Sequence, residues 1–313
     1  MCLGVFIAAS TVMVWRLEKI SQGGVEGTVL GTLCMPYLSG LGNLIFVAVI
    51  LKNNGSGNEI VVNCLVNNTT NMTLLLGLPA LIWGLSVLPP KRGRTSQKAR
   101  KKARIHRLSL LLTLIALVVF SGVLWALGQD GHLNRGDGLT LIAIFLFWQG
   151  FHVYEVVKEN IQKPKPYSGW LLLDFVALIL CGLLMYLSIE WLVSWLLKIE
   201  SGFISKEKIG LLSGWLMVLP NAILAFYYAA SKRPDVVYSS QLGDAHICIP
   251  LCVGLYAVVD TIPLAGPFNL GLALIVGASV VHFICLTALG RLPRWVGGIL
   301  VAAYAGYFYL GFV

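Results

Sequence analysis

Apolar stretches of about 20 residues recur along nearly the whole chain, and they constrain its fold more than any other feature. A helix needs about 20 residues to cross a hydrocarbon core of roughly 30 Å. Of the 313 residues, 57% are hydrophobic and 12% are charged, whereas charged residues make up about 25% of an average soluble domain. The sequence therefore predicts an all-α integral membrane protein, with little chain left for a separate soluble domain.

Hydrophobic runs bounded by polar residues, glycines and prolines predict about ten transmembrane helices. They lie at 2–15, 25–51, 60–88, 108–127, 138–157, 169–197, 209–231, 236–259, 267–289 and 296–313. The first run has neither a basic start nor a small-residue cleavage site before Arg16. It is therefore predicted to be a retained helix and not a signal peptide.

The basic residues alternate between the predicted connections. Of the 23 lysines and arginines, 18 fall in the odd-numbered connections and five in the even-numbered ones. Cytoplasmic loops of membrane proteins are enriched in Lys and Arg. The odd connections are therefore predicted to be cytoplasmic and both termini to lie outside, in a plasma or inner membrane.

The third connection, the basic loop 89–107, carries nine basic residues and most of the net charge of +9. Basic clusters of this kind also occur in proteins that bind nucleic acid or heparin. A basic loop between two spans is, however, the expected topology signal, and anionic headgroups attract it by about 1 kcal/mol per basic residue near the surface. We therefore expect membrane lipids, and no nucleic acid, as its partner.

The two halves of the chain can be laid over one another. The first half runs through Gly31, Asn43, Asn68 and Gly77 and the second through Gly210, Asn221, Asp244 and Gly254, at offsets between 176 and 179 residues. Each half would hold five spans, so the second must enter the membrane from the opposite side. The sequence thus predicts inverted five-helix repeats at 1–160 and 166–313, an architecture of secondary transporters. The alternative is chance agreement among apolar helices.

The third predicted span carries an unusual number of amides. Asn63, Asn67 and Asn71 recur every four residues and share one helix face, with Asn68 beside them. An unpaired amide in an apolar medium costs about 2–7 kcal/mol. This face is predicted to line a polar cavity, and hydrogen bonding between helices is the alternative.

The eighth predicted span carries an acidic residue, Asp244, with Ser240 one turn before it and His246 two residues after it. An Asp near the bilayer centre costs about 2.5–3.5 kcal/mol, so it marks a functional-site hypothesis. Asp244 is predicted to balance the charge of a transported cation or to exchange a proton for it. His246 would be either its proton-exchanging partner or a structural histidine.

Two pairs of segments resemble motifs of a known family. In the first pair, Leu30-Gly31-Thr32-Leu33 leads to Leu41-Gly42-Asn43 in the first half, and Ile209-Gly210-Leu211-Leu212 leads to Leu219-Pro220-Asn221 in the second. The second pair is Val66–Asn71 in the first half and Gly243–His246 in the second. They resemble the motifs of the cation/calcium exchanger superfamily, the sodium/calcium exchanger membrane region, over almost the whole chain. The resemblance implies an antiporter that moves a small inorganic cation by alternating access.

The sequence departs from this family where the family's paired carboxylates would fall, on Asn43 and Asn221. A hard divalent cation takes 6–8 oxygens, usually several from carboxylates. Either the neutral pair suits a monovalent cation, or transport has been lost. The candidate ligands of the cation (Na⁺, K⁺, H⁺ or Ca²⁺), and of any metal, are Asn43, Asn68, Asn71, Asn221 and Asp244, with Asn67, Ser240 and His246 as secondary candidates.

Helix breakers flank the two asparagines. Gly40 and Gly42 precede Asn43, and Pro220 precedes Asn221. Such residues can interrupt a membrane helix and turn carbonyls toward a cavity. The sequence therefore predicts a cation antiporter, and the alternative is a transport-inactive scaffold or sensor. It contains no HExxH, Gly-x-Ser-x-Gly or nucleotide-binding glycine motif, so we expect no enzyme, no catalytic residue and no cofactor.

Overall fold

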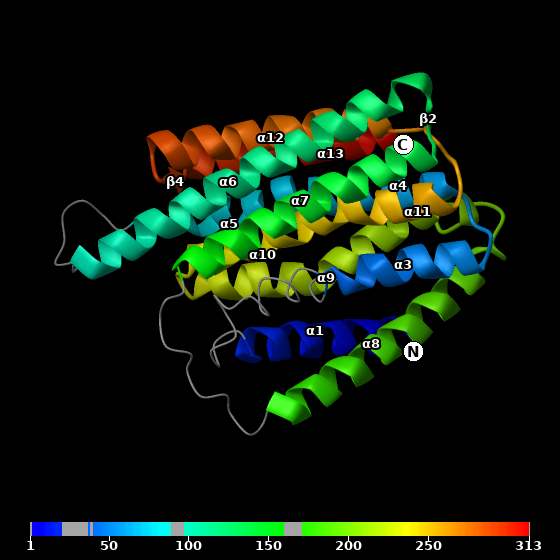
Figure 1. Cartoon of the computed structure of the whole chain (residues 1–313), viewed down its shortest axis with the longest axis horizontal. Helices are drawn as coiled ribbons and strands as arrows, with labels where there is room; N and C mark the ends of the chain where they lie inside the picture. The colour runs from blue at the N-terminus through cyan, green and yellow to red at the C-terminus, as the bar shows by residue number, and fades with distance from the viewer. Residues whose placement is uncertain (1, 21–36, 38–39, 89–96, 160–170, 313) are drawn as a thin grey trace.

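The computed structural model describes residues 2–20, 37, 40–88, 97–159 and 171–312. These residues form an elongated bundle of helices with two very short strand pairs (Figure 1). In chain order the elements are α1 (Cys2–Ile20), α3 (Leu41–Lys52), α4 (Gly57–Thr69), η2 (Thr70–Leu74), α5 (Leu75–Trp83), β1 (Leu85–Ser86), α6 (Gln97–Leu127), η3 (Gly128–Asp130), β2 (His132–Leu133), α7 (Arg135–Glu159), α8 (Leu171–Leu196), η4 (Lys206–Lys208), α9 (Ile209–Ala230), α10 (Pro234–Ile247), η5 (Cys248–Val253), α11 (Gly254–Val259), β3 (Ile262–Pro263), α12 (Phe268–Ala288), β4 (Arg291–Leu292) and α13 (Arg294–Phe312).

The described helices follow the predicted spans to within a few residues in most cases, as at α9 and α12. One prediction is corrected: α6 begins at Gln97, so residues 97–107 of the predicted basic loop are helical. Lys, Arg and Ala are strong helix formers, which explains why the helix extends through this basic stretch. Residues 89–96, and the predicted span 25–51 up to residue 36 with its Leu30–Leu33 motif, lie outside the described residues.

Seven helices of the described part are long and apolar enough to cross a membrane. They are Ala103–Asp130, Arg135–Tyr154, Val176–Leu196, Lys206–Ala230, Pro234–Val259, Phe268–Ala288 and Arg294–Phe312. Large apolar side chains cover their outer surfaces, including Phe147 at 78% exposure and Leu310 at 72%. Such exposure suits a surface that contacts lipid tails and would be costly in water.

Two π-helical turns interrupt the third and the eighth predicted spans. η2 joins α4 to α5, and η5 joins α10 to α11. They start at Thr70 and Cys248, positions that fit the offset between the two halves. The break predicted beside Asn221 is absent, because α9 runs through Pro220, whereas beside Asn43 the helix α3 begins at Leu41 with Gly40 as its N-cap and includes Gly42. Membrane helices tolerate proline where neighbouring helices satisfy the freed backbone groups.

The two strand pairs connect the halves of the chain. β1 pairs with β4, and β2 pairs with β3, both antiparallel. Figure 1 places β4 and β2 at opposite ends of the bundle. β1 and β3 each follow the π-interrupted helix of their own half. Each of them pairs with a strand, β4 or β2, that follows the next long helix of the other half.

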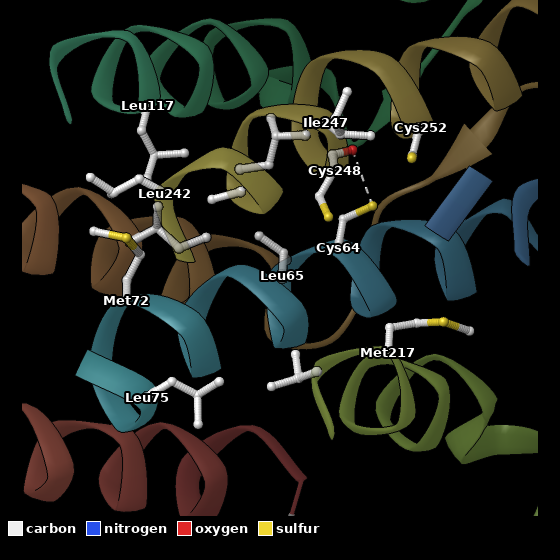
Figure 2. Close-up of a cluster of buried hydrophobic side chains, with 14 of the residues drawn as sticks. Cys64, Leu65, Met72, Leu75, Leu117, Met217, Leu242, Ile247, Cys248 and Cys252 are labelled. Carbon is white, nitrogen blue, oxygen red and sulfur yellow. Dashed lines mark hydrogen bonds between the residues drawn. The ribbon is translucent and has the colours of Figure 1, made fainter. Parts of the chain in front are cut away.

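Helix α4 lies in the core, where it packs closely against α9. A Cβ atom added to Gly214 would lie 2.8 Å from Cβ of Val66 and 3.0 Å from the carbonyl oxygen of Asn63. Small residues at such positions let membrane helices approach closely. Asn63 Nδ2 also donates a hydrogen bond to Ser213 Oγ at 2.9 Å. On the other side of α4, apolar side chains such as Leu65 and Leu242 pack between α4, α10 and α6 (Figure 2).

Candidate cation site

A series of hydrogen-bonded amides in the core ends at Asp244. Asn67 Nδ2 donates to Asn43 Oδ1 at 3.2 Å, and Asn71 Nδ2 donates to Asn67 Oδ1 at 2.7 Å. Asp244 Oδ2 accepts from Asn71 Nδ2 at 3.0 Å and from Asn221 Nδ2 at 3.1 Å. Side chains from α3, α4, η2, α9 and α10 therefore meet around one buried carboxylate, which is 2% exposed.

A cavity of about 20 Å³ adjoins this carboxylate. Its lining comes from α1, α3, α8, α9 and α10: Phe6, Ser10, Met13, Val14, Gly42, Asn43, Met185, Met217, Pro220, Asn221 and Asp244. A volume of about 10–15 Å³ is enough for one water-sized sphere. Gly42 keeps the space open, because a Cβ atom there would lie 2.8 Å from the Met217 sulfur. The cavity thus has room for one small ion or water beside Asp244.

Several buried amide oxygens around Asp244 have no hydrogen-bond partner within the described part of the chain. They are Asn68 Oδ1, Asn71 Oδ1 and Gln241 Oε1. Buried polar atoms nearly always have a partner, and amide oxygens are ligands of hard cations. An amide that turns by 180° about its last bond exchanges its oxygen and its NH₂ group. The same amides can therefore donate to a carboxylate or present oxygens to a cation.

A buried histidine holds the π turn that carries Asn71. His282 Nε2 lies 2.8 Å from the carbonyl oxygen of Met72, and His282 Nδ1 lies 3.0 Å from the hydroxyl of Tyr238. Because a carbonyl only accepts, Nε2 carries the hydrogen and Nδ1 accepts from the phenol. The imidazole of α12 therefore links η2 to α10, the two elements that position Asn71 and Asp244.

The structure brings together most of the predicted site residues. Asn43, Asn71, Asn221 and Asp244 form the hydrogen-bonded cluster, and the secondary candidate Asn67 lies within it. Asn68 is adjacent, since its Nδ2 donates to the carbonyl oxygen of Ala245 at 3.0 Å.

Two secondary candidates lie apart from the cavity. Ser240 donates to the carbonyl oxygen of Val237 at 3.1 Å and does not line the cavity. His246 Nε2 lies 2.9 Å from the carbonyl oxygen of Thr113 in α6, and its ring packs edge-on against Phe120 and Trp148. These contacts give His246 a structural position toward α6 and α7, away from the Asp244 carboxylate.

Gln241, which is not among the predicted site residues, is fully buried one turn before Asp244. Its Nε2 reaches the carbonyl oxygen of Asn221 at 3.4 Å. The signal was present, because residues three apart share a helix face. Ser10 of α1, which lines the cavity, has no comparable signal in the sequence.

The charge of the site rests on one residue. Asp244 is the one ionisable residue in the lining of the cavity, as far as the described residues go. Within those residues no group of three or more His, Cys, Asp or Glu side chains could hold a metal ion. Other acidic residues are engaged elsewhere: Asp174 pairs with Arg16 at 2.8 Å, and Glu59 Oε2 accepts from the backbone N–H of Gly210 at 2.5 Å.

The sequence matches one family of known proteins over most of its length. Residues 1–153 and 173–313 match the family described as sodium/calcium exchanger protein. A search of curated proteins found no significant match.

The fold is that of the sodium-calcium exchanger NCX_Mj. A structure of NCX_Mj soaked with 2.5 mM Na⁺ and 10 mM Sr²⁺ has a TM-score of 0.67 and 20% identity, with 99% of this chain and 96% of the other covered. A structure soaked with zero Na⁺ and Ca²⁺ has a TM-score of 0.62 and 19% identity, with 97% and 94% covered. With its long apolar helices and a family match over most of its length, the chain is an integral, multi-pass membrane protein that belongs to the sodium/calcium exchanger family.

Proposed function

We propose that this protein is a secondary antiporter that moves a small inorganic cation across the membrane by alternating access. The observation that carries the proposal is the buried cluster in which Asn71 and Asn221 share one oxygen of Asp244. An ionisable residue at membrane depth marks ion or proton pathways. Membership of the exchanger family supports the same function at the level of cation antiport.

The proposed architecture is ten transmembrane helices in two inverted repeats, 1–160 and 166–313. The two π turns support it, because they interrupt corresponding helices. The strand pairs support it as well, because exchanging the two halves converts the pair β1–β4 into the pair β3–β2. Transporters of this design bind substrate between the repeats and rock or slide one against the other.

The cation ligands in this proposal are Asp244 and the amides of Asn43, Asn68, Asn71 and Asn221, with Asn67 as a further member. Asn71 and Asn67 come from the first half, whereas Asn221 and Asp244 come from the second. The hydrogen bond from Asn71 to Asp244 therefore crosses between the halves. A movement of one repeat against the other would open the site to each side in turn.

A second candidate function is a transport-inactive scaffold or sensor. The observation that favours it is the neutral pair Asn43 and Asn221, which replaces the paired carboxylates of the resembling motifs. Under this alternative the buried cluster would be a structural polar core.

Ion flux separates the two candidates. The purified protein is reconstituted into liposomes, and uptake is measured under imposed gradients of Na⁺, K⁺, H⁺ and Ca²⁺. The antiporter proposal expects coupled flux of at least one cation, which Asp244→Asn abolishes and the control Glu207→Gln preserves, since Glu207 is exposed. A folded wild-type protein that carries none of these cations would establish the scaffold alternative.

A further inference from the structure

The residues around Asp244 supply one negative charge and no second one within the described part of the chain. The cavity lining is otherwise neutral: amides, one hydroxyl, three thioethers and apolar side chains. Asn67 and Asn71, which complete the cluster from α4 and η2, are neutral too. Among the described residues, the single carboxylate of the site therefore balances a total cation charge of +1.

The titratable groups on neighbouring elements leave this balance unchanged. In η5 the nearest is Cys248, whose carbonyl oxygen accepts from the thiol of Cys64 in α4 at 3.2 Å (Figure 2). On α12, His282 is held between Met72 and Tyr238, and on α10 itself His246 faces α6. Each of these groups is a thiol or an imidazole, so none of them brings a second carboxylate to the cavity.

A divalent cation in this cavity would leave one charge uncompensated. Apolar surroundings such as Phe6, Val14 and Pro220 cannot screen that charge, and buried unpaired charges are strongly disfavoured. A monovalent cation on Asp244 gives a neutral site. A proton on Asp244 gives a neutral site as well, whereas the bare carboxylate is charged.

We infer that the site, if the protein is the antiporter proposed above, carries one monovalent cation in exchange for one proton. When the cation leaves on one side, a proton from the water on that side bonds to a carboxylate oxygen, so the contact to the cation breaks as the O–H bond forms. The protonated site then returns and releases its proton to the other side as the next cation binds. Each cycle moves one positive charge in each direction, so no net charge crosses.

The unpartnered amide oxygens can act as acceptors both when Asp244 is protonated and when it holds a cation. Asn71 Oδ1 is buried without a partner, while Nδ2 of the same amide lies 3.0 Å from Asp244. After the amide turns, this oxygen can accept the hydrogen of a protonated Asp244 or coordinate a cation beside it. Gln241 Oε1, one helical turn away, is a second spare acceptor. The cluster thus offers acceptors that a bare carboxylate does not use.

The test is flux under a clamped membrane potential. Wild-type proteoliposomes containing a pH-sensitive dye receive gradients of Li⁺, Na⁺, K⁺ or Ca²⁺ in separate experiments, with the potential held at zero or at either sign. We expect a monovalent gradient to drive protons in the opposite direction at a ratio of 1:1, at a rate that the potential does not change. Flux that follows the potential, or Ca²⁺ flux equal to the monovalent flux, would overturn the inference while leaving antiport intact. Absence of all flux would instead refute the proposed function.

A gain of charge provides the second arm. Asn221→Asp adds a carboxylate to the cavity lining, and we expect it to carry Ca²⁺ at least tenfold faster than wild type. The matched control, Asn269→Asp, adds the same charge at an exposed position of α12, and it should leave Ca²⁺ flux at the wild-type level. Equal Ca²⁺ flux in wild type and Asn221→Asp would show that charge does not select the ion. If Asn221→Asp fails to fold, the wild-type potential dependence decides alone.

Discussion

The link between Tyr238, His282 and Met72 gives a prediction whose size follows from the structure. Tyr238 and His282 are both 0% exposed, so no water can replace a lost partner. Tyr238→Phe removes one hydrogen bond and leaves Nδ1 of His282 without a donor. Such losses cost about 1–3 kcal/mol in proteins, and polar pairs between membrane helices average about 0.6 kcal/mol. We expect Tyr238→Phe to destabilise the protein by about 0.6–2 kcal/mol.

His282→Leu keeps a similar volume and removes both hydrogen bonds. It orphans the carbonyl of Met72 and the hydroxyl of Tyr238, so we expect a loss of roughly 1–4 kcal/mol. Because Met72 follows Asn71, the π turn should also shift, and cation flux should fall more than in Tyr238→Phe.

The assay is unfolding in mixed detergent micelles, followed by tryptophan fluorescence, together with flux in liposomes. Tyr309→Phe is the matched control, since Tyr309 is 68% exposed. If Tyr238→Phe were as stable as Tyr309→Phe, the imidazole would not hold η2 against α10. Full flux in a folded His282→Leu protein would show that the position of Asn71 does not depend on it.

Three further predictions concern charge, packing and topology. If protons and the cation compete for Asp244, flux should fall as the pH on the cation-loading side falls, and a flat pH profile in wild type would contradict the competition. Gly214→Ala places its Cβ 2.8 Å from Cβ of Val66, so it should lower the free energy of unfolding by about 1–3 kcal/mol in the same unfolding assay. The control Gly277→Ala meets nothing within 4 Å and should not lower it. A cysteine introduced at Ser96 should resist labelling from outside intact cells, because the connection is predicted to be cytoplasmic; rapid labelling would reverse the predicted orientation.

The convergence around Asp244 could be predicted because it depends on regular features. The offset between the halves aligns Asn43 with Asn221, and the i, i+4 spacing places Asn67 and Asn71 on one face. His246 is predicted to be either a proton-exchanging partner or a structural histidine, and its contacts fit the second, because a residue two positions from Asp244 points to nearly the opposite side of the helix. Closeness in sequence was a poor guide there, and spacing by three residues would have indicated Gln241.

The π turns and the strand pairs could not be predicted from local pattern. η2 (TNMTL) is mostly polar and η5 (CIPLCV) is apolar, so the two turns share no composition that would mark the extra residue in the turn. Each strand is two residues long, and its partner lies far away in sequence, as for Leu85 and Leu292. Only the packing of the two halves brings such segments together.

The bonds between the halves have a consequence for biosynthesis. During synthesis, the hydrogen bond of Asn63 forms only after Ser213, 150 residues later, has been made. The bond from Asn71 likewise requires Asp244, 173 residues later. At a translation rate of about 5–20 residues per second, the gap lasts roughly 8–35 s. During that interval the newly inserted first half presents a row of amides to lipid or to the insertion machinery. We therefore expect the first half expressed alone to be less stable in the membrane than the whole chain, because Asn63 and Asn71 then lack these partners.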